Sequence, residues 1–379
     1  MNEGIHITGI GAVSPAGNTL PDIWKALMQP RPPEPQTLSI AGTPRAVKAY
    51  ILDPEAYERS PEEYFLDICT RAIRLAAEDS GLPVDFARSC ILIGSGMGAA
   101  EALLDRPALP DGYPAGWAEK IRSQLEWRGD VQWMANACCA AAQAIAYGCE
   151  LLQSRRFDRV IAGGAEIFSY LVYSGFRRLN ALDEEGCRPF HPSRRGIAVG
   201  DGAAFFVLER QAGRKDYGRI TGQAVTNDAY HVAAPEPKGE QAGRCIRLAL
   251  ERTGSPRGVD VVVAHGTGTR RNDSIEAKLL YELFGPVNVI APKERLGHTG
   301  GASGAFNLLA ALGCLRYQML PQTSEWSLED AEARLRLFPT PHSGSVERIL
   351  SNCFAFGGTN VAMVCEGIKR RKDGEGGEK

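Results

Sequence analysis

Short runs of apolar and β-branched residues recur along the chain, and most are continuous rather than alternating with polar residues. A continuous run of this length is typical of a strand that is buried on both faces of a sheet. The pattern therefore predicts a largely buried sheet. The runs lie at residues 5–8, 91–94, 159–163, 204–209, 219–225, 259–265, 287–292, 349–354 and 361–366.

Segments with apolar positions at helical spacing separate many of these runs. They cover residues 62–80, 241–253 and 274–284, and a glycine follows each one. Glycine favours the left-handed conformation that commonly closes a helix. The alternation of strands and helices predicts a layered α/β fold.

Two further helical segments differ because they carry small or apolar residues on nearly every side. These are 139–152 (CAAAQAIAYGCELL) and 300–315 (GGASGAFNLLAALGCL). A helix without a polar face is usually buried in the middle of a molecule. One follows Cys138 and the other follows His298, both potentially reactive side chains. Two similar central helices, one in each half, indicate an internal duplication.

Composition and charge narrow the class of protein. The 379 residues fit two or three folding units, or one large duplicated unit. Forty-three Lys and Arg against 45 Asp and Glu leave a net charge of −2, so no overall field favours nucleic acid or an anionic membrane. With 44% hydrophobic and 23% charged residues, the chain is predicted to be an ordinary globular protein.

Several sequence signals are missing. No signal peptide is recognised at the N-terminus, and no stretch approaches the ~20 apolar residues of a membrane span. The ten cysteines form no CxxC pair and have no histidine at zinc spacing, so reduced thiols are expected in a cytoplasmic protein. Dinucleotide, P-loop, zincin and α/β-hydrolase motifs are incomplete or missing.

Cys138 is a candidate nucleophile. It lies in MANACCAAAQAI, where an extended stretch meets the first central helix. The positive end of a helix lowers the pKa of a thiol, so a reactive thiolate is expected there. A buried structural cysteine is the alternative, and for an arbitrary cysteine it is the commoner case. The sharp entry into a central helix favours a nucleophile.

Two of the six histidines lie beside glycine-rich turns. His265 follows a predicted strand in VDVVVAHGTGT, and His298 precedes the second central helix in KERLGHTGGASG. Sites in open α/β sheets collect at the carboxyl ends of strands, so both are candidates for catalysis rather than core histidines. Phe356 precedes Gly357 and Gly358, whose backbone can approach a ligand closely or simply form a tight hairpin.

Together these motifs resemble the β-ketoacyl-acyl-carrier-protein synthases of the KAS I/II type, in the thiolase superfamily. The resemblance covers roughly residues 5–366, and the motifs follow the family's order. They are ITGIGAVSPAGN near the start, ACxxA at Cys138, GGAE at 163–166, RPF…GDGAAFFVLE at 188–209, DAYH at 228–231, HGTGT…ND..EA at 265–277, K….GH at 293–298 and FGGTN at 356–360.

The resemblance implies a thiolase-like α/β fold of five layers, α-β-α-β-α, built from two similar halves. The N-terminal half would be 1–213, with the nucleophilic cysteine, and the C-terminal half 214–366, with the two histidines. Residues 367–379 are expected to form a disordered tail. The stretch 99–135 looks compressed, His191 and Arg195 replace acidic residues, and Leu296 replaces a small polar one.

The resemblance also implies the catalytic residues. Cys138 would accept an acyl group from a phosphopantetheine thioester. His265 and His298 would drive decarboxylation of a carrier-bound malonyl group and stabilise the enolate. Lys293 and Glu276 would form a supporting pair on the His298 side of the site. The two-histidine pattern separates the chain from the Cys-His-Asn synthases.

Other residues are assigned to substrate binding by the same resemblance. The backbone amides of Cys138 and Phe356 would form the oxyanion hole, and Phe356 would gate the acyl pocket. Thr267 and Thr269 would hydrogen-bond the pantetheine arm. Cys139 is interpreted as a packing residue. Cys353 directly precedes FAFGGTN, a position where the ketosynthases often have serine. It is therefore not interpreted as the second catalytic cysteine of a thiolase.

The expected activity is a decarboxylative Claisen condensation in fatty acid or polyketide biosynthesis. No metal or organic cofactor is implied, because phosphopantetheine arrives on the acyl carrier protein. The expected partners are acyl carrier protein and a second ketosynthase chain, as a homodimer or heterodimer joined across an edge strand near 131–135. The alternative is a partner subunit that resembles the chain-length factors. Such subunits characteristically lack the nucleophilic cysteine, which this chain keeps.

Overall fold

The fold was analysed in a computed structural model, which describes residues 4–30, 33–38, 46–81, 88–100, 115–323 and 335–368. Its helices are α1 (Leu20–Leu27), α2 (Pro54–Arg59), α3 (Pro61–Ser80), α5 (Ala115–Gln124), η1 (Ala137–Cys139), α6 (Ala140–Gln153), α7 (Tyr170–Arg178), α8 (Glu240–Arg252), α9 (Arg270–Phe284), α10 (Lys293–Leu296), η2 (Gly300–Ala302) and α11 (Ser303–Tyr317). Its strands are β1 (Ile5–Val13), β2 (Gln36–Leu38), β3 (Val47–Ala49), β4 (Ser89–Gly94), β5 (Asp130–Met134), β6 (Arg159–Glu166), β7 (Gly202–Glu209), β8 (Arg219–Asn227), β9 (Val261–Val263), β10 (Asn288–Ile290), β11 (Met319–Leu320), β12 (His342–Ser343), β13 (Arg348–Phe354) and β14 (Thr359–Glu366).

The order of the strands repeats between the two halves of the chain. Ten strands are hydrogen-bonded in the order β10-β9-β13-β14-β8-β1-β7-β6-β4-β5. From either outer edge inward, three parallel strands are followed by two antiparallel ones. The halves meet where β1 pairs briefly with β8. This symmetry supports an internal duplication, while the division at residues 213 and 214 stays a prediction.

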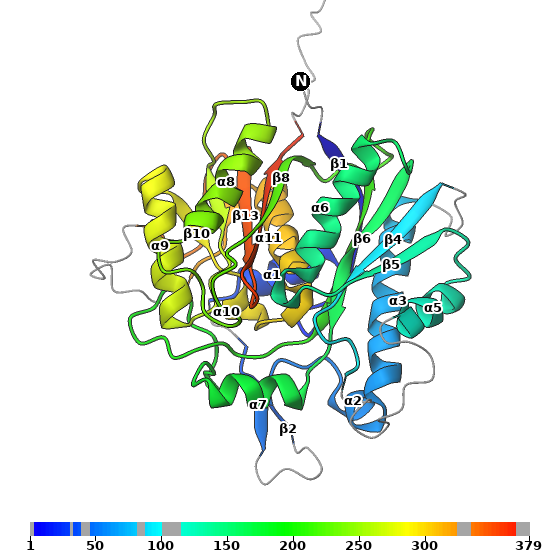
Figure 1. Ribbon diagram of the computed structural model, residues 1–379, viewed down its shortest axis with the longest axis horizontal. Helices are drawn as coiled ribbons and strands as arrows, with labels where there is room; N and C mark the ends of the chain where they lie inside the picture. The colour runs from blue at the N-terminus through cyan, green and yellow to red at the C-terminus, as the bar shows by residue number, and fades with distance from the viewer. Residues whose placement is uncertain are drawn as a thin grey trace, which may run out of the picture.

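The helices and the two halves of the sheet form five layers. Figure 1 shows α6 and α11 between the halves, α3 and α5 outside one half, and α8 and α9 outside the other. The side chains of β7 alternate accordingly. Phe206 and Leu208 pack in the central core with α6 and α11, while Phe205 and Val207 pack in the outer core with α3. The predicted α-β-α-β-α architecture is confirmed.

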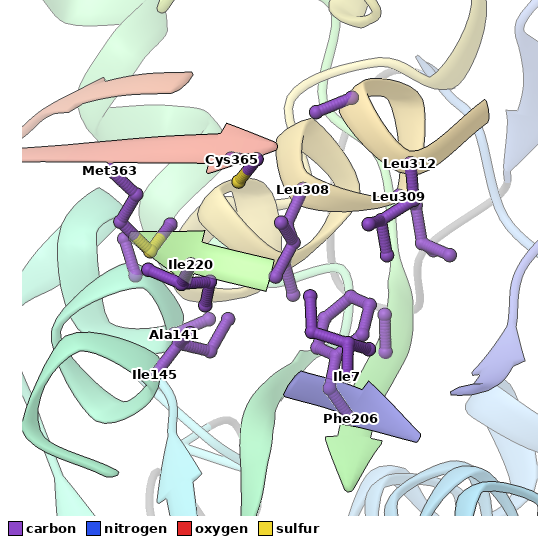
Figure 2. Close-up of a cluster of buried hydrophobic side chains, with 14 of the residues drawn as sticks. Ile7, Ala141, Ile145, Phe206, Ile220, Leu308, Leu309, Leu312, Met363 and Cys365 are labelled. Carbon is purple, nitrogen blue, oxygen red and sulfur yellow. The ribbon is translucent and has the colours of Figure 1, made fainter. Parts of the chain in front are cut away.

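The central helices are buried because they lack a polar face. Leu308, Leu309 and Leu312 of α11 pack in one cluster with Ile145 of α6 (Figure 2). The helices approach each other closely at Gly304. A Cβ atom there would lie 2.5 Å from the Ala142 Cβ and 2.8 Å from its backbone nitrogen. This close approach holds η1 and η2, which precede the two helices, near each other.

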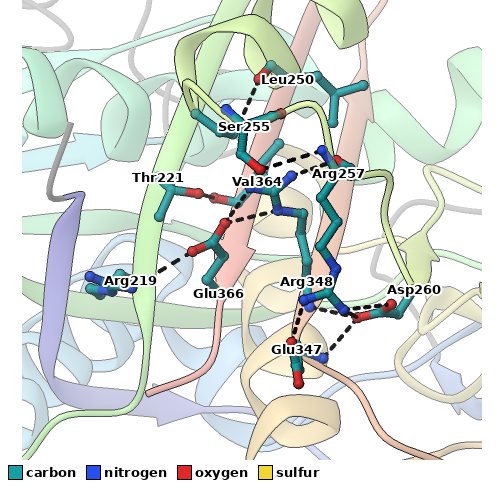
Figure 3. Close-up of polar contacts among 11 residues, drawn as sticks. Arg219, Thr221, Leu250, Ser255, Arg257, Asp260, Glu347, Arg348, Val364 and Glu366 are labelled. Carbon is teal, nitrogen blue, oxygen red and sulfur yellow. Dashed lines mark hydrogen bonds and ion pairs between the residues drawn. The ribbon is translucent and has the colours of Figure 1, made fainter. Parts of the chain in front are cut away.

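A polar network connects the starts of β9 and β13 with the end of β14 (Figure 3). The buried Arg348 guanidinium at the start of β13 donates to Glu366 at the end of β14, with 2.6 Å between Nη2 and Oε1. Asp260, just before β9, accepts from the backbone nitrogens of Glu347 and Arg348 at 2.8 and 2.9 Å. These contacts fix the register of β9, β13 and β14, whose other ends lead to His265 and Phe356.

Every predicted strand run contains or overlaps a strand of the structure, and both central helices are present. The helix predicted at 274–284 begins earlier, at Arg270, because Thr269 takes the extended backbone of a helix N-cap. The edge strand that the resemblance implied near 131–135 is β5, whereas helices α1, α5 and α7 were not among the predicted elements. The middle of the stretch 99–135 and residues 369–379 of the tail lie outside the described residues.

Within the described ranges, no helix is both long and apolar enough to cross a membrane.

Candidate active site

Cys138 lies in a strained turn between β5 and α6. The preceding residue, Ala137, has a φ of 41°, in the left-handed region that side chains other than glycine seldom adopt. The turn places Cys138 in the wall of a cavity of about 630 Å³. The neighbouring Cys139 is fully buried, and its thiol donates to the Thr359 carbonyl oxygen at 3.4 Å. Of the two thiols, only that of Cys138 faces the cavity.

The electrostatics of Cys138 differ from the prediction. Burial raises the pKa of its thiol to about 12, and the nearby Cys353 thiol adds to the rise. Lys293 and the Phe356 backbone act in the opposite direction but do not offset burial. The expected low pKa is therefore wrong. Cys138 lies in the short turn η1 before α6 begins, where desolvation outweighs the positive end of the helix.

His265 is held by Glu276 and Lys293. The Glu276 carboxylate accepts from the backbone nitrogens of His265 and Gly266 at 2.8 and 2.9 Å. The Lys293 ammonium donates to the His265 carbonyl oxygen at 2.6 Å and lies 3.5 Å from its Nδ1. The supporting pair was expected on the His298 side; these hydrogen bonds join it to His265, while Lys293 also contributes to the lowered pKa of His298. Glu276 lies on α9, which packs over the strand end that carries His265.

His298 is oriented by the start of the second central helix. Its Nδ1 accepts from the Gly300 backbone nitrogen at 3.1 Å and lies 3.0 Å from the Ser303 hydroxyl. The rings of His265 and His298 meet edge to face, with centroids 5.8 Å apart. Burial, and then Lys293, lowers the pKa of His298 to about 3 and that of His265 well below its usual range.

The two histidines thus have the same arrangement of donors and acceptors. A neutral imidazole that accepts at Nδ1 carries its proton on Nε2. Nδ1 of His265 faces the Lys293 ammonium, and Nδ1 of His298 faces a backbone N–H. This assignment follows from the hydrogen bonds around each ring. Both residues line the 630 Å³ cavity, where two Nε2–H donors suit a developing negative charge on oxygen.

Phe356 lies between this cavity and a second one of about 280 Å³, whose lining is mostly apolar. Cys138, His298, Phe176 and Phe356 line both cavities. The Phe356 ring is 39% exposed and lies 5.4 Å from the Phe176 ring, between centroids. Its backbone hydrogen-bonds to the Cys138 thiol, which places an amide donor beside the sulfur.

Thr267 and Thr269 line the larger cavity, with their hydroxyl oxygens 2.9 Å apart. Asp273, on α9, holds the same loop from beneath. Its carboxylate accepts from the backbone nitrogens of Thr267 and Gly268 at 3.0 and 3.1 Å. Asp273 was not predicted as a site residue, although it belongs to the ND pair of the HGTGT…ND..EA motif. The conformation of the loop that carries Thr267 and Thr269 therefore depends on the Asp273 carboxylate of the same motif.

Two other residues of the site, Glu166 and Phe176, were also not predicted from the sequence. Glu166 ends the GGAE motif, and its buried carboxylate accepts from the backbone nitrogens of Gly96, Met97 and Gly301. It ties the loop after β4 to η2, beneath the smaller cavity. Phe176 of α7 had no signal in the sequence, because only the tertiary contacts bring it to His298 and Phe356. No metal-binding group of three or more His, Cys, Asp or Glu occurs in the described part of the chain.

Comparison with known proteins assigns the family. A model described as "Beta-ketoacyl synthase, N-terminal domain" matches residues 2–213, and one described as "Beta-ketoacyl synthase, C-terminal domain" matches residues 217–327. The chain belongs to the β-ketoacyl synthase family. This β-ketoacyl synthase is similar to the 3-oxoacyl-acyl-carrier-protein synthase 2 of Synechocystis sp., with 30% identity over 405 residues. The match covers 95% of this chain and 97% of the relative.

Solved structures agree with this β-ketoacyl synthase in fold. The ishigamide ketosynthase/chain length factor has a TM-score of 0.84 at 24% identity. A ketosynthase solved in complex with a type II PKS acyl-carrier protein, and bound to the hexaketide, has a TM-score of 0.83 at 21% identity. Each comparison covers 97% of this chain and 100% of the other chain. The predicted thiolase-like ketosynthase fold is thereby confirmed.

Proposed function

We propose that this protein catalyses the decarboxylative Claisen condensation of an acyl group, carried on Cys138, with malonyl-acyl carrier protein. The observation that carries the proposal is one cavity lined by the Cys138 thiol and by two neutral histidines, His265 and His298. A thiol accepts an acyl group, and two N–H donors stabilise an enolate. The product is a β-ketoacyl thioester of fatty acid or polyketide biosynthesis.

The first step is acyl transfer to Cys138. The sulfur attacks the thioester carbonyl carbon, and the new C–S bond forms as the bond to the pantetheine sulfur breaks. Because burial raises the pKa of the thiol, its proton leaves during the attack and ends on the departing sulfur. The backbone amides of Cys138 and Phe356 would stabilise the tetrahedral oxyanion, an arrangement whose loss typically costs ~10²–10³ in rate. The acyl chain would enter the 280 Å³ cavity.

The second step is decarboxylation and carbon–carbon bond formation. Malonyl thioester loses carbon dioxide, and the electron pair moves onto an enolate whose oxygen accepts from Nε2–H of His265 and His298. The enolate carbon attacks the acyl carbon, and the bond to Cys138 breaks. The sulfur then takes up one proton. Lys293 and Glu276 act as positioning residues, because both hold His265 rather than the substrate.

Acyl carrier protein is the proposed donor of both substrates. The larger cavity has exposed lining residues, including Arg270 and Arg271, and would take the pantetheine arm past Thr267 and Thr269. One solved ketosynthase of the same fold is bound to an acyl-carrier protein, and another is a ketosynthase/chain length factor. We extend both kinds of association to this chain, with no cofactor besides the carrier's phosphopantetheine.

A chain-length-factor-like role is the second candidate, because one relative in the fold comparison is a ketosynthase/chain length factor. The catalytic proposal is favoured here, since Cys138 opens into the same cavity as both histidines. A partner subunit without its own catalysis has no need for this arrangement.

Intact-protein mass after incubation with acyl carriers tests the proposal. Wild-type protein and Cys139→Ala should each gain one acyl mass, because the Cys139 thiol faces away from the cavity. Cys138→Ala should gain none. Cys139→Ala is a matched control, since it removes an adjacent thiol and leaves the turn intact. No acylation of the wild type by any carrier, together with activity of a partner that requires this chain, would instead support the second candidate.

A further inference from the structure

Asn307 is a buried polar residue on the second central helix, α11. It is 1% exposed, and its neighbours Phe306 and Leu308 belong to the apolar core. Its Nδ2 donates to the carbonyl oxygen of Ala264 at 3.2 Å and to that of Asn352 at 2.9 Å. Because a buried amide is costly unless it is hydrogen-bonded, these two bonds explain how the helix accommodates an asparagine at this position.

The two carbonyl groups lie where the sheet divides. Strands β9 and β13 pair in parallel as far as Val263 and Ser351. Beyond this point β9 ends, while β13 continues its pairing with β14. Ala264 and Asn352 are the next residues along the two strands. The Asn307 amide therefore bridges the two strands just beyond their last ladder pair.

One of the bridged carbonyl groups belongs to the peptide group that precedes His265. The N–H of this peptide group donates to the Glu276 carboxylate at 2.8 Å, and its carbonyl oxygen accepts from Asn307. The peptide group is thus held on one side by α9 and on the other by α11. The direction in which the His265 ring enters the larger cavity depends on the orientation of this group.

The other bridged carbonyl group belongs to the peptide group that precedes Cys353. The Cys353 thiol donates to the carbonyl oxygen of Cys138, with 3.1 Å between sulfur and oxygen. Asn307 is therefore connected to the turn that carries Cys138 as well as to His265. Buried polar networks whose members are all hydrogen-bonded make the surrounding structure rigid. This network would fix the spacing between Cys138 and His265.

We propose that Asn307 is a positioning residue that holds His265 at the distance from Cys138 that the reaction requires. The inference rests on the proposed function and adds a residue that lines neither cavity at Cys138. Asn307 acts through two backbone carbonyl groups and does not touch the substrate. Without the bridge, His265 should shift relative to the enolate oxygen, and a small misplacement of this kind can cost ~10²-fold in rate.

Asn307→Leu tests this role, because leucine has a similar shape but no N–H group to donate. Release of carbon dioxide from malonyl-acyl carrier protein should fall ~10–10²-fold. Alkylation of Cys138 by iodoacetamide, which needs no histidine, should proceed as in the wild type. This difference separates a shift of His265 from a general loss of structure, which would slow both reactions.

Leu312→Ala is the matched control. Leu312 is fully buried further along α11, beside Gly218 and away from the bridged carbonyl groups. The cavity left by the alanine should lower the melting temperature, but carbon dioxide release by the folded variant should stay at the wild-type rate.

Three outcomes would contradict the positioning role. They are a wild-type rate of carbon dioxide release in Asn307→Leu, an equal fall in release and in alkylation, and an equal loss of release in Leu312→Ala. If Asn307→Leu does not fold, Asn307→Ser should still slow release, because its single hydroxyl group donates to at most one carbonyl oxygen. A wild-type rate in that variant would also contradict the role. No release by the wild type would contradict the proposed function itself, and the role of Asn307 with it.

Discussion

At the scale of single residues, the protonation of the two histidines decides how the site works. His265 and His298 are buried beside the Lys293 ammonium, and both effects disfavour the charged imidazolium. In the proposed mechanism, a neutral ring with its proton on Nε2 donates to the enolate oxygen without first losing or gaining a proton. The histidines would therefore already be in the form that the proposed decarboxylation step requires at neutral pH.

The pH dependence of decarboxylation should reflect this state. Because the pKa of His298 is lowered to about 3 and that of His265 is also lowered well below its usual range, both rings are neutral at neutral pH. Release of carbon dioxide from malonyl-acyl carrier protein should thus show no titration near pH 6.5, and acid should slow it only as the pH approaches the lowered pKa values.

His298→Ala should reduce this release by ~10²–10⁴-fold while leaving acylation of Cys138 intact.

A half-maximal loss of carbon dioxide release near pH 6.5 would contradict the assigned charge state. Unchanged release in His298→Ala would contradict the role of that ring. Acylation of Cys138, followed by intact mass in the same samples, is the control for the folding of each variant.

At the scale of elements, the close contact between α6 and α11 bears on the position of Cys138, the proposed nucleophile. Gly304→Ala would place its Cβ atom 2.5 Å from the Ala142 Cβ, so the helices must move apart. Overpacking of this kind typically destabilises a protein by ~1–3 kcal/mol. Because Cys138 lies just before α6, the variant should also acylate more slowly. Denaturant unfolding and the rate of acylation measure the two effects.

Gly175→Ala is the matched control for this prediction. Gly175 lies within α7, and no atom is within 4 Å of the position that its Cβ would take. Alanine there should leave stability unchanged or raise it by ~0.5–1 kcal/mol, since alanine favours helix. Equal stability of Gly304→Ala and the wild type would contradict the tight helix contact.

At the scale of the whole molecule, β5 lies at an edge of the sheet. It pairs with β4 on one side, and no further strand pairs with it within the described ranges. Val131 and Trp133 are only partly buried there. An open edge with half-exposed apolar side chains favours association with another strand. The predicted dimer across residues 131–135 is compatible with this position.

Light scattering tests the association. The protein should have twice the mass of one chain, either alone or with a neighbouring ketosynthase as partner. A stable monomer under both conditions would contradict the prediction. Mixtures at several concentrations distinguish a specific dimer from aggregation, because only the dimer reaches a constant mass.

Local pattern alone predicted much of this protein. The continuous apolar runs identified the strands, since burial on both faces leaves few polar positions in them. The absence of a polar face on 139–152 and 300–315 predicted two central helices, which the structure has at Ala140–Gln153 and Ser303–Tyr317. These features depend on neighbouring residues in the chain. Local pattern did not join Cys138, His265 and His298 into one site; the family resemblance of their motifs implied this, and the structure places all three on one cavity.

Tertiary structure alone decided the features that depend on residues far apart in the sequence. Burial reversed the expected pKa shift of Cys138, because the helix end is local whereas desolvation comes from the whole pocket. The contacts of α9 and α10 show that Glu276 and Lys293 hydrogen-bond to the backbone of His265, and that Lys293 acts on the pKa of both histidines. Likewise, no pattern in KERLGH distinguishes Arg295 from a solvated arginine. Only the packing around α10 buries its guanidinium, which has no hydrogen-bond partner among the described residues.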